Sequence, residues 1–161
     1  TKADFIKYMD NYEVGVARKE IDFFFWHDLC DNYIELVKER LYQPEKHGFD
    51  QNLSGKYTLN ILLLEILKMY SAITPHICET IYLSINKTNQ KSITTLEIKK
   101  ENFEKDIIEK GEALKELIST IRKFKTNNEL SMKDSVKNVI ISSDKETIEF
   151  LKIILYNVIV W

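Results

Sequence analysis

Glycine and proline are scarce in this sequence, with four and two residues respectively among 161. Both residue types mark tight turns and interrupt regular helices. Their scarcity argues against a fold built from many short strands and turns. It favours long helices joined by few loops.

Long hydrophobic runs are also missing. Ile61–Leu64, which no other run exceeds in length, is far shorter than the roughly 20 apolar residues of a membrane-spanning helix, so no contact with a membrane is expected. The opening residues, TKADFIKYMDNYE, lack the apolar core of a secretory signal. Two cysteines without an export signal are expected to be reduced thiols of a cytoplasmic protein. The missing initiator methionine and the apolar end Val158–Trp161 predict a fragment of a longer chain.

The chain has no strong charge of either sign, since its formal net charge is −2. A domain that binds nucleic acid commonly has a strongly basic face or a high pI. Overall composition therefore gives no support to nucleic-acid binding. Any such binding must depend on local groups of charged residues.

What is abundant is apolar and aromatic residues, at 44% and 11% of the chain, enough for a sizeable core. Apolar spacings of three and four predict helices. They are expected at about 2–12, 13–42, 53–73 and 75–86, with a loop over 43–52. Thr74-Pro75 is typical of an N-cap followed by proline at the first helical position. The sequence therefore predicts a mainly α protein whose residues 1–88 form an antiparallel helical bundle.

The second helix, 13–42, is predicted to bury one stripe and expose the other side. The stripe contains residues at helical spacing, widened by three further apolar residues: Phe23, Trp26, Cys30, Tyr33, Val37 and Leu41, with Phe25, Leu29 and Leu36. Trp26 and Tyr33 lie in its middle and are expected in the core. Asp31, Glu35 and Lys38 lie on the opposite, solvent-facing side.

The composition changes after residue 88, and residues 89–161 are predicted to form a small α/β appendage, truncated at its C-terminus. A strand is expected at 92–98, a helix at about 104–125 and a buried β-branched strand at 136–141. Ser143-Asp144-Lys145-Glu146 has the pattern of a capping box that opens a last helix. The predicted order is strand, helix, strand, helix.

Four segments, in order, resemble the anticodon-binding domain of class I aminoacyl-tRNA synthetases, with the valyl-tRNA synthetases as the best match. They are YEVGVARKEIDFFFWHDLCDNYIELVKERLY from Tyr12, ILKMYSAITPHICETIY from Ile66, KSITTLEI from Lys91, and ELISTIRKFKTNNELSMKDSVKNVII from Glu116. The chain departs from the family pattern at Cys78, where threonine or serine is more common, and at Thr94, which replaces a histidine. The Trp-Pro that follows that strand in the family is also missing.

The resemblance implies a tRNA-binding domain whose partners are the anticodon stem-loop of tRNA, expected to be that for valine, and the catalytic domain of the same parent chain. The two catalytic signatures of the class, His-Ile-Gly-His and Lys-Met-Ser-Lys-Ser, are absent from these 161 residues. The fragment is therefore expected to be no enzyme by itself and to hold no cofactor. The parent, a ligase acting in translation, would use ATP and magnesium. The fragment is expected to be a monomer.

The candidate tRNA-binding residues follow from the chemistry of unpaired bases. Valine anticodons end in adenine and then cytosine, whose amino groups are donors, and carboxylates are natural acceptors for them. Asp31 and Glu35 are predicted to offer these acceptors. Lys38, Arg18 and Lys19 are predicted to contact phosphates, which position RNA without reading it. Arg40 lies near the edge of the apolar stripe, and Phe25 and Tyr42 are the candidates for base stacking; an ordinary solvated helix face would explain the same charges.

Three other interpretations remain open at this point. An isoleucyl-type domain would read uracil in place of the last cytosine. A helical protein-interaction scaffold would use the acidic face of the second helix for docking. A small metalloenzyme would need His27 with Cys30, or His76 with Cys78, to join a four-ligand zinc site. On a helix His27 lies about 60° from Cys30, whereas His76 and Cys78 diverge.

Overall fold

The computed structural model describes residues 1–87, 91–99, 104–131, 134 and 139–155. The chain divides into two compact units, Thr1–Glu101 and Asn102–Trp161. Helices dominate both units, and the described ranges contain no strand. The prediction of a mainly α helical bundle is thus confirmed, whereas the α/β character expected for residues 89–161 is not observed among the described residues. No helix in the described part of the chain is both long and apolar enough to cross a membrane.

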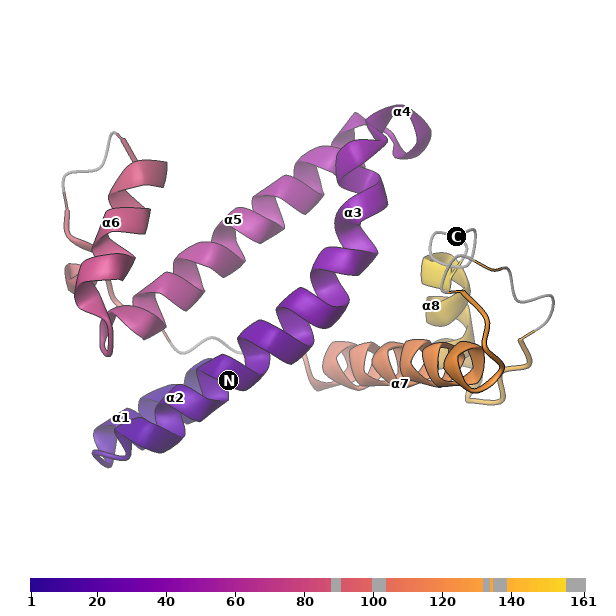
Figure 1. The fold of residues 1–161 in the computed structure, drawn as a ribbon, viewed down its shortest axis with the longest axis horizontal. Coiled ribbons are helices and arrows are strands. Elements are labelled where there is room, and N and C mark those ends of the chain that lie inside the picture. Colours follow the sequence, from indigo (N-terminus) through magenta and orange to yellow (C-terminus); the bar gives the residue numbers. More distant parts are fainter. Residues whose placement is uncertain (88–90, 100–103, 132–133, 135–138, 156–161) are drawn as a thin grey trace. The chain divides into compact units, whose positions relative to one another are not determined.

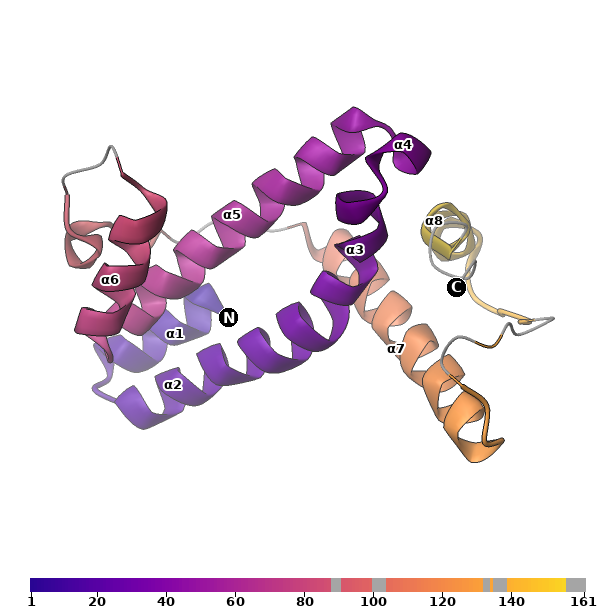
Figure 2. The same ribbon diagram turned by 45° about the horizontal axis from the view of Figure 1, so that its top comes forward.

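The first unit is built around two long helical segments that run in opposite directions. One is a continuous arm made of α2, η1 and α3, and the other is α5, which runs back beside the arm (Figures 1 and 2). The other elements pack on these two. In chain order the elements are α1 (Lys2–Asp10), α2 (Val14–Phe23), η1 (Phe24–Ile34), α3 (Glu35–Tyr42), α4 (Pro44–His47), α5 (Phe49–Ser71), α6 (Pro75–Ile85) and η2 (Ile93–Thr95).

The middle of the arm, η1, is a π-helix of 11 residues. Such helices have i→i+5 hydrogen bonds and therefore take more residues per turn than an α-helix. The residues that face the core are spaced by four: Ile21, Phe25, Leu29, Tyr33 and Val37 are all buried or half-buried. In an α-helix this series would drift by about 40° at each step. The wider π turns offset that drift and keep the series on one side.

This geometry corrects the predicted stripe of the second helix. Phe23 and Trp26 were expected in the core, yet they are 60% and 58% exposed. Tyr33 is half-buried against the core, and Val37 is fully buried. The prediction was wrong for Phe23 and Trp26 because it assumed 3.6 residues per turn through a segment that is wound more loosely.

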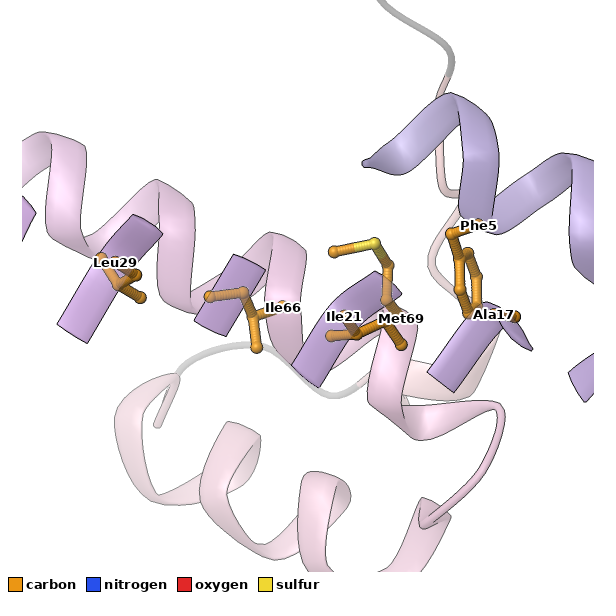
Figure 3. Close-up of a cluster of buried hydrophobic side chains, with 6 residues drawn as sticks. All are labelled: Phe5, Ala17, Ile21, Leu29, Ile66 and Met69. Atoms are coloured by element: carbon orange, nitrogen blue, oxygen red, sulfur yellow. The ribbon is translucent and has the colours of Figure 1, made fainter. Parts of the chain in front are cut away.

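The main core lies where α1, α2, η1 and α5 meet. Figure 3 shows its buried side chains projecting from these elements toward one another: Phe5, Ala17, Ile21, Leu29, Ile66 and Met69. Complete burial of one large apolar side chain stabilises a fold by about 1.5–3 kcal/mol. This cluster therefore holds the N-terminal half of the arm against the C-terminal half of α5.

At the other end the chain reverses through α4, and the contact between α3 and α5 is polar as well as apolar. The buried Asn52 amide donates to the carbonyl oxygens of Arg40 and Leu41, at 2.8 and 2.9 Å. It thereby satisfies two carbonyls at the C-terminus of α3, which have no partner inside their own helix. Asn52 lies in a region that was predicted to be a loop, and α5 begins at Phe49, four residues before the expected start at Leu53.

Gly55 allows the close approach of these two helices. A Cβ atom at this position would lie 2.9 Å from Cγ2 of Val37 and 3.2 Å from Cδ2 of Leu41. Val37 is fully buried and β-branched, so its side chain has few alternative rotamers. The helices could not pack at this distance with a larger residue at position 55.

A second core joins α6 and η2 to the C-terminal half of α5. Leu67, Cys78, Tyr82 and Ile93 are its buried members. Ile93 belongs to the predicted strand 92–98, which instead forms the 3₁₀ turn η2 followed by extended chain. The strand prediction was wrong because the described residues contain no partner strand and side chains take its donors. The Ile93 N–H and the Ser92 hydroxyl both donate to Glu79 Oε2 at 2.9 Å.

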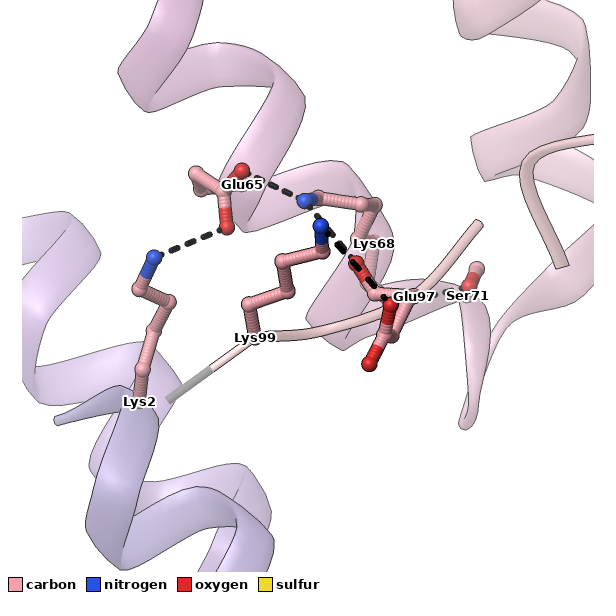
Figure 4. A network of polar contacts seen from close by, with 6 residues as sticks. All are labelled: Lys2, Glu65, Lys68, Ser71, Glu97 and Lys99. Atoms are coloured by element: carbon pink, nitrogen blue, oxygen red, sulfur yellow. Dashed lines mark hydrogen bonds and ion pairs between the residues drawn. The ribbon is translucent and has the colours of Figure 1, made fainter. Parts of the chain in front are cut away.

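A network of charged groups also ties this segment to α5, as Figure 4 shows. Glu65 accepts from Lys2 at 3.1 Å and pairs with Lys68 at 2.5 Å, while Lys68 donates to the carbonyl oxygen of Glu97 at 3.2 Å. Burial raises the pKa of Glu65, but the hydrogen bonds from Lys68 and Lys2 outweigh it, so the net pKa is lowered. Residues 93–98 thus pack with the first unit, whose boundary at Glu101 lies beyond the predicted boundary at 88.

The second unit contains α7 (Lys105–Asn127) and α8 (Lys145–Leu155). Lys110 links the two helices, since its ammonium donates to Asp106 and to Glu146 at 2.7 Å each. The cap of α8 is Asp144, whose carboxylate accepts from the Thr147 N–H at 2.9 Å. Hydrogen bonding with Thr147, through its side chain first and then through its backbone N–H, lowers the pKa of Asp144 to about 2. A capping box with Ser143 as its first residue was predicted, so the cap lies one residue later than expected.

The second predicted strand, 136–141, falls partly outside the described residues. Residues 139–141 are described and are not in a strand. Residues 156–161, where the predicted last helix would continue, also lie outside the described part.

We predict that Gly55→Ala destabilises the first unit by up to about 2 kcal/mol. Overpacking a well-packed contact costs about 1–3 kcal/mol, which exceeds the gain of about 1 kcal/mol from replacing glycine by alanine in a helix. Gly111→Ala in α7 is the matched control, because a Cβ atom there meets nothing within 4 Å, and it should be stabilising. Urea unfolding followed by circular dichroism measures the free energy of unfolding of both variants. Equal stabilisation by the two substitutions would show that the Val37 side chain moves away from the new Cβ atom at no energetic cost.

The end of the helix pair also predicts a pH dependence. Glu39 is buried, accepts a hydrogen bond from Lys46 and lies 3.2 Å from Nε2 of His47. The hydrogen bond from Lys46 is the main cause that lowers the Glu39 pKa below its ordinary 4.5. A lowered folded-state pKa gives stability that is fully present above the unfolded-state pKa and is lost as pH falls through the folded-state pKa.

Glu39→Gln should therefore lower stability at pH 7 and make the loss of stability between pH 5 and pH 3 shallower than in the unmodified chain. Urea unfolding at pH 7, 5, 4 and 3 measures this. Glu45→Gln removes an exposed carboxylate from α4 and tests whether the loss of any carboxylate has the same effect. Identical pH profiles for Glu39→Gln and the unmodified chain would contradict the assignment.

Candidate nucleic-acid interface

The outer face of the arm has charged and polar side chains, several of which are paired with a neighbour on the same helix. Nε of Arg18 lies 3.4 Å from Asp22, and Nδ1 of His27 lies 3.4 Å from Asp31. Further along, Lys38 donates to Glu35 at 2.6 Å. Pairs three or four residues apart are neighbours on a helix surface and contribute a few tenths of a kcal/mol each. Their weakness means that a ligand can replace them at little cost.

Asp31 and Glu35 are both exposed, as predicted for groups that read base edges. They lie on either side of the junction between η1 and α3. A carboxylate has about four lone-pair positions. The ion pair with Lys38 therefore leaves Glu35 able to accept a donor from a ligand while it keeps this contact.

The predicted cations are found in two groups. Arg18 and Lys19 are exposed on α2, whereas Lys38 and Arg40 are half-buried on α3. Lys38 already contacts Glu35, so a cation and an acceptor lie side by side. The structure thus brings Glu35 and Lys38 together but places Arg18 and Lys19 at the far end of the arm.

A hydrogen-bonded chain fixes the position of Arg18. The Tyr70 hydroxyl donates to Asp22 at 2.5 Å, and the other oxygen of Asp22 is the one that faces Arg18. Burial, and then the bond to Asp22, raise the pKa of Tyr70 well above its ordinary value, so the hydroxyl keeps its proton. The chain links α2 to α5 and orients the guanidinium group on the outer face.

The aromatic residues are arranged differently from the prediction. Tyr42 is 80% exposed, as a stacking residue must be. Phe25 is half-buried and packs against the core, with Trp26 edge-on at 5.0 Å. Sequence reasoning missed Phe23, Trp26 and His27 as surface groups, of which Phe23 and His27 have ring centroids 4.8 Å apart. The run of four aromatic residues Phe23–Trp26 was the available signal, because one face of a helix cannot take four consecutive side chains.

The metal hypothesis receives no support from the described residues. Among them, no group of three or more histidine, cysteine, aspartate or glutamate side chains is placed to hold a metal ion. Cys78 is buried, with its sulfur 3.7 Å from Oγ1 of Thr74, while His76 is exposed. Cys30 is half-buried and is also a free thiol. Packing explains both cysteines.

Comparison with known proteins covers most of the chain. A valine–tRNA ligase of Ehrlichia ruminantium (strain Gardel) is 37% identical over 141 residues, which cover 84% of this chain and 17% of that protein. The valine–tRNA ligase of Pyrococcus furiosus is 29% identical over 151 residues, 91% of this chain and 16% of the relative. That of a Wolbachia species is 32% identical over 135 residues, 83% of this chain and 16% of the relative.

The chain thus spans about one sixth of the length of these relatives. No solved structure matches it significantly. Residues 1–141 match the family described as the anticodon-binding domain of tRNA ligase. With this match and the helical bundle described above, the chain belongs to the anticodon-binding domains of tRNA ligases.

Proposed function

We propose that this chain is the anticodon-recognition domain of a valine–tRNA ligase and binds the anticodon loop of valine tRNA. The observation that carries the proposal is the adjacency of Glu35, Lys38 and Asp31 on the exposed side of the arm, in a chain of the anticodon-binding family. Two carboxylates match the two amino-group donors of adenine and cytosine. Lysine beside them matches a phosphate.

The arm suits this task because its inner side is fixed. Its core-facing residues pack against α5, and the buried Asn52 holds the C-terminus of α3. Side chains that contact the anticodon bases from a rigid helix lose little conformational freedom when the RNA binds. This reduces the entropy cost of association. Tyr42, at the end of α3, is exposed enough to stack on an unpaired base.

The chemical reaction belongs to the rest of the parent protein in this proposal. The catalytic domain of the parent would bind ATP and magnesium and attach valine to tRNA, whereas the 161 residues bind and position the tRNA. We propose that the domain is monomeric and acts in the cytoplasm, where translation takes place.

The choice of valine over isoleucine rests on the last anticodon base. Cytosine presents an amino donor where uracil presents a carbonyl acceptor. A face with carboxylates at positions 31 and 35 favours the donor and repels the acceptor. The valine–tRNA ligases among the relatives point the same way.

We predict that the chain binds a valine anticodon hairpin at least fivefold more tightly than the same hairpin with uracil as the last anticodon base. One well-placed contact discriminates between bases by about 1–3 kcal/mol. Fluorescence anisotropy with labelled hairpins at 50 and 200 mM salt measures both affinities. Binding through phosphates should weaken steeply with salt. Preference for uracil would instead favour an isoleucyl-type domain.

Glu35→Ala should remove most of the preference for cytosine over uracil. Asp31→Ala should weaken binding to both hairpins or reduce the preference for adenine at the neighbouring anticodon position. Glu112→Ala is the matched control, since Glu112 pairs with Lys115 at 2.6 Å and i,i+3 spacing in the same way as Glu35 with Lys38. An equal effect of Glu112→Ala would show that the loss is not specific to the arm. Absence of binding at 50 mM salt would favour the protein-interaction scaffold.

A further inference from the structure

One face of α5 is apolar and exposed over the first half of the helix. Phe49, Leu53, Tyr57 and Ile61 follow one another at intervals of four, and they are 72%, 54%, 65% and 42% exposed. We call these four residues the α5 stripe. Large apolar patches on a folded domain commonly mark a surface that another molecule or segment covers.

The α5 stripe continues an interface that is already formed. From Leu64 onward α6 packs against α5, and Leu67 is buried there with Cys78 and Tyr82. On a helix with 100° per residue, Leu64 lies within about 20° of Tyr57 in projection. Figures 1 and 2 show α6 beside the C-terminal half of α5. The same face of α5 is therefore covered by a helix at one end and open at the other.

The surroundings of the α5 stripe are poor in charge. Between Phe49 and Ile61 the charged residues are Asp50 and Lys56, whereas 30% of the whole chain is charged. The central part of a protein–protein interface is depleted of charge and enriched in tyrosine and phenylalanine. A phosphate-rich ligand would require more cations than this face offers.

We propose that the α5 stripe is covered by a helix from another part of the same polypeptide, which completes the bundle beside α6. The relatives are about six times longer than this chain, so most of such a polypeptide lies outside the 161 residues. A covalently linked segment has an effective concentration in the millimolar range. An apolar helix is the partner that fits a stripe spaced by four, since residues i and i+4 on one helix pack into the grooves of another.

Thiol labelling of Leu53→Cys tests the proposal, with Gln51→Cys as the matched control. Gln51 is exposed on the same helix, about 160° away from Leu53 in projection. Each variant is made in the 161-residue chain and in the full-length polypeptide that carries it, without RNA. Reaction with a maleimide is followed by mass spectrometry of the peptide that contains residue 51 or 53, so that Cys30 and Cys78 do not interfere.

We expect Cys at position 53 to react at least tenfold more slowly in the full-length polypeptide than in the chain, and Cys at position 51 to react at the same rate in both. Equal rates at position 53 would overturn the proposal. Slower labelling of the chain alone at 200 µM than at 2 µM would overturn it in favour of a second copy. Tyr57→Cys repeats the test if Leu53→Cys fails to give the circular dichroism spectrum of the unmodified chain. No outcome depends on anticodon recognition, because RNA is absent from the assay.

Discussion

The contact of Gly55 with Val37 and Leu41 keeps the two long helical segments together where the chain reverses direction. Because the backbones approach so closely, Asn52 reaches the last carbonyls of α3 and satisfies them with its amide. Those two features fix the end of the arm that lies next to Lys38 and Glu35. At the opposite end, Ile66 and Met69 of α5 pack with Ile21 of α2 and Phe5 of α1. The arm is thereby held at both ends and exposes its outer side.

This arrangement separates the residues that build the fold from those available to a ligand. Charged side chains of the outer side form pairs with neighbours on the same helix, such as Glu35 with Lys38. In contrast, the charges that join different parts of the first unit are partly buried, as in the network of Glu65 with Lys2 and Lys68. The weak ion pairs on the outer side of the arm can be exchanged for contacts with RNA. Loss of the partly buried ion pairs of Glu65 would instead destabilise the first unit.

The sequence was sufficient to predict the helical bundle, since the apolar spacing in α5 and α6 and the signal Thr74-Pro75 all pointed to it. It also predicted exposure of Asp31 and Glu35. It could not reveal the π-helix, because the number of residues per turn depends on packing against α5, and this error put Trp26 in the core. The strand expected at 92–98 is not formed for a related reason. β-Branched residues such as Ile93 favour strands, but a strand needs a partner strand, and the described residues of this unit contain none.

The π-helix also affects how the length of this region can vary. Deletion of one residue from an ordinary α-helix rotates everything beyond it by about 100° and misplaces a whole face. A π turn already contains an additional residue relative to an α turn, so a shorter version of Phe24–Ile34 can revert to α geometry and keep both flanking helices in register. Evolutionary insertions and deletions should therefore be tolerated in η1 more readily than in α5, where Asn52 and Gly55 must remain three residues apart.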